Sequence, residues 1–286
     1  MKYKIGAVIT TYNPDIDRLK SVINNIYNQV FIIVIVDNNS NNYNKIYELF
    51  KNYNINFVKR NKNYGLGSSL NHGIDILMDY NLDYIVTLDQ DSVPLIDFDY
   101  AIDNAINKYN NIGIISIAGN SRNKNGIEMA NKNNIIIISG SINNINIYKN
   151  GIRYREDFFV DQIDIDFKYN VEKAGFKVLI INGNYLDHRL GIQLKGKYDD
   201  YELPWRLYLI IRNSTSLLIE RKISFKLYIS QLINWNLREI YFYGMYNIFF
   251  IFIINFTGLF DGIINNNKKN MKFYNFNFFN HKNFYK

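Results

Sequence analysis

The sequence predicts an α/β domain built on a mostly parallel, doubly wound sheet with helices on its faces. Three observations carry this prediction: short β-branched apolar runs, segments between them with apolar residues at helical spacing, and polar clusters where the runs end. The first two runs cover residues 4–10 and 31–37, and residues 16–27 between them have the helical spacing. Such a strand, helix, strand unit places its two strands parallel in one sheet.

Two further strands continue the same alternation. Residues 56–59 form a third apolar run, residues 68–79 the next helical segment, and residues 84–88 a fourth run. The turn before this helix contains Gly65 and Gly67, but it lacks the third glycine or the Lys-Ser/Thr pair of a phosphate-binding loop. We therefore expect a tight turn at Gly65 that lines a ligand-binding site rather than a phosphate-binding loop.

The amino-acid composition of the chain changes beyond residue 221. Residues 225–260 are rich in Ile, Phe, Tyr and Trp, and five lysines but no acidic residue lie between residue 267 and the end. We expect a domain over residues 1–221, divided into 1–95 and 96–221, followed by a helical extension over 222–286. That extension either packs on the preceding domain or lies in a membrane interface with its basic end near anionic lipid.

Composition and charge limit the classes of protein to which this chain can belong. A formal net charge of +7 suits nucleic acid, an anionic membrane or a phosphorylated substrate, and charge does not choose among them. No nucleic-acid-binding motif is recognisable, so we expect no nucleic-acid partner. The sequence has no cysteine, which excludes disulfides, thiolate nucleophiles and cysteine metal sites. With no leader apparent at the start, we expect a cytoplasmic protein.

Polar clusters follow three of the predicted strands, at residues 11–13, 37–39 and 89–91. In a doubly wound sheet the carboxyl ends of parallel strands meet at one edge, where ligands bind. Asp89 and Asp91 are spaced to reach one hard divalent cation, Mg²⁺ or Mn²⁺, although a solvated acidic turn is the alternative. Asp37 can accept a hydrogen bond from a uracil or thymine ring, or it is an ordinary turn aspartate.

A second acidic cluster, Asp161, Asp164 and Asp166, precedes a helical segment that ends near residue 173. One of these carboxylates can serve as a general base. The alternative is favourable negative charge at a helix N-terminus, without catalysis. Asp161 and Asp164 share a helix face if the helix begins early enough.

The motifs together resemble a known family. Residues 9–14, 36–40, 63–65, 71–74, 88–92 and 139–141 are similar, in order, to family 2 inverting glycosyltransferases of the GT-A fold. The Asp-Gln-Asp-Ser form at 89–92, the segment 158–166 and the run His188-Arg189-Leu190-Gly191 resemble rhamnosyltransferases of surface-polysaccharide assembly. The resemblance extends over residues 4–215, and it implies that 1–221 is catalytic, with a nucleotide-sugar half (1–95) and an acceptor half (96–221).

The resemblance also implies roles for individual residues. Asp164 falls in the register of the catalytic base, with Ile163 in place of a glutamate, and Asp161 is the extra carboxylate of the rhamnosyltransferase-like subgroup. Asp166 stands where that subgroup has Glu, and Asn170 where it has Arg. The metal ligands implied are Asp89, Asp91 and His188, the last of which is otherwise a structural histidine. The implied nucleotide-sugar site comprises Thr11, Tyr12, Asn13, Asp37, Asn39, Gly65, Asn71, Asp89, Gln90, Arg206 and Arg212. The two arginines would lie near the diphosphate and offset its charge, and a salt bridge on a helix surface is the alternative for either.

These roles predict inverting transfer of a sugar from a dTDP- or UDP-linked donor to a hydroxyl of a glycan or polyprenyl-linked acceptor, with a rhamnose-like sugar favoured. An acceptor held on lipid would make contact with the inner membrane leaflet useful. Two alternatives remain: a non-catalytic nucleotide-sugar-binding relative, and a nucleotidyltransferase. The latter predicts a glycine-rich, basic loop after the first strand, which residues 10–14 lack.

Overall fold

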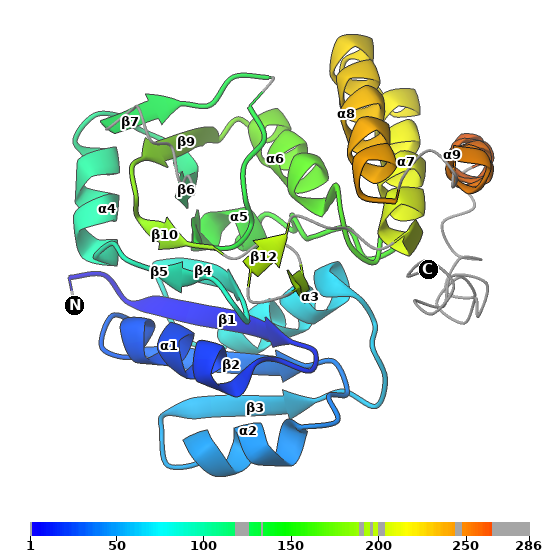
Figure 1. The fold of residues 1–286 in the computed structure, drawn as a ribbon. Helices are drawn as coiled ribbons and strands as arrows, with labels where there is room; N and C mark the ends of the chain where they lie inside the picture. Colours follow the sequence, from blue (N-terminus) through cyan, green and yellow to red (C-terminus); the bar gives the residue numbers. More distant parts are fainter. Residues whose placement is uncertain are drawn as a thin grey trace. The chain divides into compact units, whose positions relative to one another are not determined.

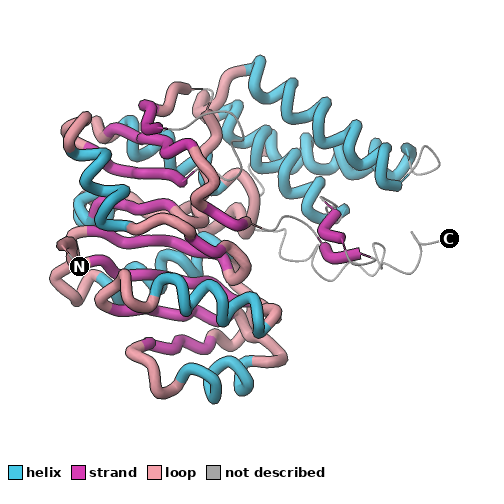
Figure 2. Tube along the Cα trace, turned by 60° about the vertical axis from the view of Figure 1, so that its left-hand side comes forward, coloured by secondary structure: helices cyan, strands magenta, loops and turns pink. Residues whose placement is uncertain are grey.

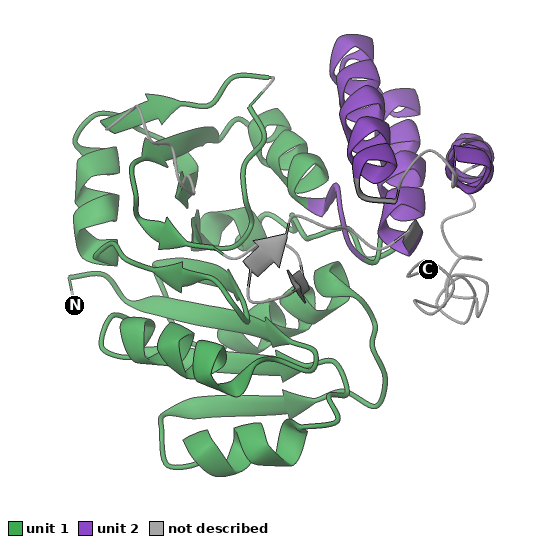
Figure 3. Ribbon diagram, in the orientation of Figure 1, with its two compact units in different colours: residues 1–159, 164–189 green, residues 160–163, 190–286 purple. Residues whose placement is uncertain are grey.

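The computed structural model describes residues 2–117, 126–132, 134–188, 192–194, 197–199, 204–243 and 248–264. It divides into two compact units, the first formed by residues 1–159 and 164–189 and the second by 160–163 and 190–286 (Figure 3). The sequence analysis placed its boundary after residue 221, whereas this division comes near residue 190. Each unit is described by itself.

An eight-stranded sheet forms the centre of the first unit, in the order β3-β2-β1-β4-β8-β6-β9-β7 (Figure 1). Its first four strands all run parallel, as predicted. In this half the strands are β1 (Ile5–Thr11), β2 (Ile32–Asp37), β3 (Ile55–Lys59) and β4 (Tyr84–Asp89). The predicted boundaries of these strands are thus correct to within one residue.

The other half of the sheet is mixed. Strand β8 runs antiparallel to both β4 and β6, β9 runs parallel to β6, and β7 runs antiparallel to β9. The bounds are β6 (Ile112–Ile117), β7 (Gly126–Met129), β8 (Ser141–Asn144) and β9 (Lys177–Asn182). The fold is therefore α/β with a mostly parallel central sheet, which confirms the predicted class.

Helices cover both faces of this sheet (Figure 2). The helices of the first unit are α1 (Ile16–Ile26), α2 (Tyr43–Phe50), α3 (Leu66–Leu77), α4 (Phe98–Ile106), α5 (Ile145–Lys149) and α6 (Ile163–Lys173), whose first residue is grouped with the second unit. On one face α1 buries its apolar stripe against alternate residues of β1 such as Ala7 and Ile9. On the other face α3 comes so close that a Cβ at Gly73 would lie 2.6 Å from Val8 Cγ1. Because successive strand residues point to opposite faces, β1 is fully buried between two helical layers.

Three helices dominate the second unit: α7 (Pro204–Ile219), α8 (Phe225–Tyr243) and α9 (Ile248–Ile263). Helices α7 and α9 pack tightly, because a Cβ at Gly262 would lie 2.6 Å from Thr215 Cβ, and Tyr208 donates a 2.7 Å hydrogen bond to Asp261. Two short strands, β11 (Ile192–Leu194) and β12 (Lys197–Asp199), pair antiparallel. Within the described ranges, every helix is too short or too polar to cross a bilayer.

Candidate active site

The three predicted polar clusters meet along the carboxyl edge of the parallel strands. In the strand register Thr11 lies opposite Asp37, and Thr10 lies opposite Asp89. The backbone N–H of Tyr12 donates to Gln90 Oε1 at 2.7 Å, and Gln90 Nε2 donates back to the Tyr12 carbonyl at 3.3 Å. Gln90 thereby joins the loop after β1 to the loop after β4, so the two predicted clusters form one continuous rim.

Asp37 is fully buried at the end of β2. Its Oδ2 accepts hydrogen bonds from Thr11 Oγ1 at 2.8 Å and from Ser40 Oγ at 2.5 Å, and its Oδ1 accepts the Ser40 backbone N–H at 2.8 Å. This carboxylate therefore fixes the turn after β2, as the turn-aspartate alternative expects. Its contact with a pyrimidine stays a prediction.

Three predicted site residues occupy left-handed backbone positions in the loops of this rim. Asn13, Asn39 and Gly65 have φ angles of 49°, 70° and 87°. Asparagine and glycine tolerate this conformation better than other residues. At Gly65 a Cβ would lie 2.5 Å from the Phe159 carbonyl oxygen, so the tight turn expected there also requires a close backbone approach.

Asn71 is buried in α3 and is bonded at both ends of its amide. Its Oδ1 accepts the Tyr154 backbone N–H at 2.9 Å, and its Nδ2 donates to the Tyr154 carbonyl and to Glu156 Oε1. The side chain ties the segment around residue 154 to α3. A direct contact between Asn71 and a nucleotide sugar remains a prediction.

Asp89, Asp91 and His188 form a cluster in which one potential ligand atom from each residue lies within 4.8 Å of the others. A short ribbon brings them together: β5 (Val93–Pro94) pairs antiparallel with β10 (Leu186–Asp187), with Asp187 opposite Val93. The ribbon places residue 188 beside residue 91, although they are far apart in the sequence. The predicted set of ligands is thus assembled in space.

The chemistry of this cluster fits a divalent cation. All three side chains are partly exposed, so an ion and a diphosphate can reach them. Carboxylate oxygens are the ligands that Mg²⁺ and Mn²⁺ prefer. Burial raises the pKa of the Asp91 carboxyl above its ordinary value, while the charges of His188 and Arg18 act in the opposite direction. Burial is the larger effect, so the two positive charges offset only part of the rise in the pKa of Asp91.

Two residues that support the cluster received no role in the sequence analysis. Ser92 is fully buried, and its Oγ lies 2.5 Å from His188 Nδ1, which sets the orientation of the imidazole ring. Arg18 of α1 is buried and donates to both segments that carry the cluster, at Asp91 and at Asp187. The sequence feature that could have indicated Arg18 is its position next to the apolar stripe of a predicted helix, where a charged residue is unusual.

The structure separates Asp161 from Asp164. Helix α6 begins at Ile163, so Asp161 lies before the helix with a φ of 63°, and the two carboxylates do not share a helix face. Asp161 is paired with Arg206 through bonds of 2.6 and 3.2 Å, and Asn213 donates to its backbone carbonyl at 3.0 Å. All three residues belong to the second unit.

Asp164 and Asp166 lie in the first turn of α6. Asp164 is partly exposed, and its Oδ1 accepts the Ile165 backbone N–H at 2.9 Å. Asp166 is 2% exposed, lies 3.6 Å from Arg155 and accepts a 2.9 Å bond from Asn170. The two departures from the subgroup pattern, Asp166 and Asn170, are therefore bonded to each other.

Arg206 and Arg212 were predicted beside the diphosphate, and both lie in the second unit. Arg206 forms the ion pair with Asp161, as the salt-bridge alternative expects. Arg212 is 1% exposed and donates to Asn213 Oδ1 at 2.8 Å. Their contact with a donor stays a prediction. Residues 189–191 of the His-Arg-Leu-Gly run, and the lysines from residue 268 onward, lie outside the described residues.

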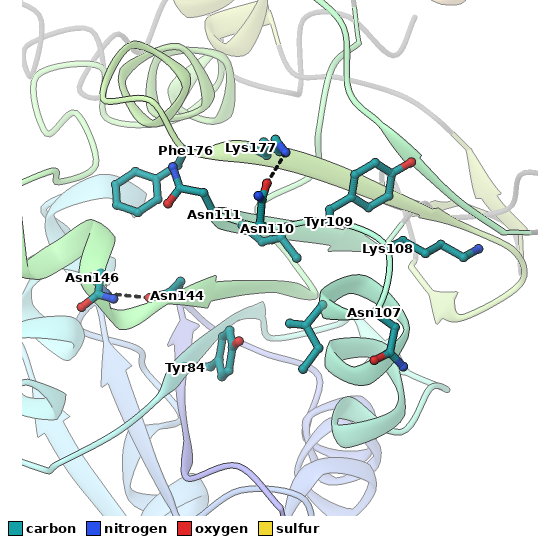
Figure 4. Close-up of a pocket in the computed structure, with 12 residues that line it drawn as sticks. Tyr84, Asn107, Lys108, Tyr109, Asn110, Asn111, Asn144, Asn146, Phe176 and Lys177 are labelled. Carbon is teal, nitrogen blue, oxygen red and sulfur yellow. Dashed lines mark hydrogen bonds between the residues drawn. The ribbon is translucent and has the colours of Figure 1, made fainter.

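A cavity of about 580 Å³ lies at the opposite edge of the sheet, where β4, β6 and β9 begin (Figure 4). Several of its polar groups are bound to protein atoms: Lys177 donates to Asn110 at 2.6 Å, and Asn111 donates to the Gly175 carbonyl. We therefore assign this cavity no part in the chemistry at the carboxyl edge.

Comparison with known proteins agrees with this architecture. Residues 7–176 match the sequence profile described as Glycosyl transferase family 2. The dTDP-rhamnosyl transferase RfbF of Shigella flexneri is 23% identical over 257 residues, which cover 82% of this chain and 86% of that protein.

Solved structures share the fold at low sequence identity. Residues 1–349 of S. aureus TarS align with a TM-score of 0.57 at 13% identity, over 91% of this chain and 80% of that one. The chain spans only 40% of the longer TarS structure. The mannosyltransferase PcManGT from Pyrobaculum calidifontis, in complex with GDP-Man and Mn²⁺, aligns with a TM-score of 0.55 at 14% identity, over 76% and 64% of the two chains. With its GT-A fold and a family match over most of its length, the chain belongs to glycosyl transferase family 2.

Proposed function

We propose that this glycosyltransferase is metal-dependent and inverting, and that it moves a sugar from a nucleoside-diphosphate donor to an acceptor hydroxyl. The observation that carries the proposal is the cluster of Asp89, Asp91 and His188 at the carboxyl edge of the parallel strands, beside the loop that carries Tyr12. In sheets of this kind ligands bind at that edge.

Asp89, Asp91 and His188 would hold the cation. Bound there, Mg²⁺ or Mn²⁺ supplies positive charge that stabilises the departing diphosphate. The relative PcManGT was solved with GDP-Man and Mn²⁺, which supports Mn²⁺ as the first ion to test. Thr11, Tyr12 and Asn13 would bind the nucleotide along the rim that Gln90 holds together.

Asp164 is our candidate for the general base. It takes the proton of the acceptor hydroxyl, the hydroxyl oxygen then attacks the anomeric carbon, and the bond to the diphosphate breaks on the opposite face. Its exposure supports this choice: Asp164 lies in the first turn of α6 and is partly exposed, so an acceptor can reach it, whereas Asp166 is 2% exposed. The N-terminus of α6 favours the negative charge of Asp164 before proton transfer.

For the donor we propose a dTDP-linked, rhamnose-like sugar, and for the acceptor a glycan or a polyprenyl-linked glycan of surface-polysaccharide assembly. The similarity to a dTDP-rhamnosyl transferase supports this choice. Purified protein with Mn²⁺ is incubated with dTDP-rhamnose, UDP-glucose, UDP-galactose and GDP-mannose, and release of nucleoside diphosphate is measured. We expect the greatest release from dTDP-rhamnose and its loss with EDTA. Equal release with EDTA would contradict the metal role, and no release from any donor would favour a non-catalytic relative.

We also propose that the second unit docks on the inner leaflet as a peripheral membrane element. Helix α8 exposes an apolar residue every four positions, and α9 exposes several phenylalanines. The α8 residues are Phe225, Ile229, Ile233, Leu237 and Tyr241, and the α9 residues are Phe249, Phe250, Phe252, Phe256 and Phe260. Exposed aromatic and aliphatic side chains of this kind bury readily at the headgroup boundary.

The docking test compares flotation of the full chain with phosphatidylglycerol-containing liposomes and with neutral liposomes. We expect binding that falls when four of the exposed α9 phenylalanines, Phe249, Phe252, Phe256 and Phe260, are replaced by Gln. A control replaces Phe31 of the first unit, which is also exposed, by Gln. Unchanged flotation of the α9 variant would rule out docking through this helix.

A further inference from the structure

Arg18 bridges the two segments that carry the candidate metal ligands. Its Nε donates to the backbone carbonyl of Asp91 at 2.7 Å. One terminal nitrogen donates to Asp187 Oδ2 at 2.6 Å, and the other donates to the Asp187 backbone carbonyl at 2.5 Å. Asp91 is itself a candidate ligand, and Asp187 directly precedes His188. A single side chain on α1 thus contacts both sides of the cluster.

We propose that Arg18 is a positioning residue that sets the distance between Asp91 and His188 so that both reach one cation. This inference rests on the proposed metal role of the cluster. Arg18 acts through the two segments rather than on the substrate, because it is 7% exposed and its bonded nitrogens all point to protein acceptors. It is therefore distinct from the residues that would touch the ion or the donor.

The ribbon between the two segments is too short to fix this distance without help. Strands β5 and β10 have two residues each, and isolated two-stranded pairs are at best marginally stable. Besides the strand pairing, Ser92 joins the segments through His188, while Arg18 joins them through three bonds on the side of α1. These contacts together hold the cluster in shape before any ion arrives.

The geometry requires an arginine. The planar guanidinium presents donors in a fixed fork, so three bonds in different directions form with little loss of rotamer freedom. A lysine at the same position keeps the positive charge near Asp91, but its single nitrogen cannot replace three donor nitrogens. Charge and geometry can therefore be separated by substitution.

The test uses the full-length variants Arg18→Lys and Arg18→Met, with Lys20→Met as the control. Lys20 lies on the same helix, is exposed, and loses the same charge without touching the cluster. Mn²⁺ affinity is measured by titration calorimetry and by the electron paramagnetic resonance signal of bound Mn²⁺. We expect about 10- to 100-fold weaker Mn²⁺ binding for both Arg18 variants, the range typical of groups that support metal ligands, and unchanged binding for Lys20→Met.

Hydrogen exchange of the metal-free proteins gives an independent measure. We expect faster amide exchange in residues 90–93 and 186–188 of Arg18→Lys, while the amides of β1 and β2 keep wild-type protection and so show that the domain is folded. Mn²⁺ affinity within twofold of wild type in both Arg18 variants would overturn the proposal. If wild-type protein binds no Mn²⁺, the metal role fails, and the exchange of these two segments alone decides whether Arg18 positions them.

Discussion

The two acidic clusters of this protein use their carboxylates differently. At the end of β4, Arg18 contacts the backbone carbonyl of Asp91 rather than its carboxylate, and three potential ligand atoms converge within 4.8 Å. Before α6, Arg206 binds both carboxylate oxygens of Asp161, and Arg155 lies 3.6 Å from the carboxylate of Asp166. Aspartates thus form a candidate cation site in the first cluster, whereas in the second cluster Asp161 and Asp166 are paired with arginines.

Replacing Asp164 tests whether it is the general base of the second cluster. We expect this substitution to have the largest effect on kcat. Asp164→Asn keeps the shape of the side chain but removes its ability to accept a proton, so we expect a 100- to 10,000-fold loss in kcat, on the order of what general bases contribute. Donor affinity, measured by calorimetry with the nucleotide sugar, should stay at the wild-type value. Wild-type turnover in this variant would remove Asp164 from the base role.

Asp91 tests the first cluster. We expect Asp91→Asn to bind Mn²⁺ weakly and to lose about 1,000-fold in kcat, because the cation supplies several kcal/mol of charge stabilisation. EDTA treatment of the wild type should have a similar effect, reversed by added Mn²⁺. Asp75→Asn, which changes an exposed aspartate paired with Arg153, is the matched control. A fully active Asp91→Asn protein in EDTA would exclude metal dependence.

Replacing Ser92 should have an intermediate effect, on Mn²⁺ affinity. Ser92→Ala removes the contact with His188 Nδ1 and leaves the ring free to rotate, so Mn²⁺ affinity should fall about tenfold while the thermal midpoint changes little. Isothermal titration measures the first quantity and calorimetric unfolding the second. Unaltered Mn²⁺ affinity would mean that His188 is held by other contacts or does not ligate the ion.

Replacing Arg206 has the smallest expected effect on the metal site. Because the pair with Asp161 is partly exposed, we expect Arg206→Met to destabilise the protein by about 1–2 kcal/mol, less than for a fully buried pair. Urea unfolding measures this change, and Mn²⁺ affinity should be unaltered. A loss of Mn²⁺ affinity equal to that of Asp91→Asn would break the distinction between the two clusters.

The parallel half of the fold and its rim were accessible from the sequence. Buried parallel strands read as continuous β-branched runs, and the rule that ligands bind at their carboxyl ends placed Thr11, Asp37 and Asp89 on one edge. Both signals are local. The rim follows from the strand register without further information.

Features that depend on long-range or backbone detail were not accessible. Helix α6 begins only after Asp161 because Phe159, Asp161 and Gln162 have left-handed backbone conformations. Non-glycine residues adopt this conformation rarely, so the sequence does not indicate it. The contacts of Arg18 join segments far apart in the sequence. The antiparallel β8 and the packing of α7 on α9 likewise depend on partners that no local pattern specifies.

The close packing of α7 on α9 has a consequence for biosynthesis. Domains tend to fold in the order in which the ribosome releases them, and α9 leaves the ribosome after α7 and α8. Until then Gly262 cannot cover Thr215, and Tyr208 lacks its bond to Asp261. The second unit therefore completes its core only after α9 has left the ribosome, and a nascent chain that stalls after α8 would present the apolar side of α7 to chaperones.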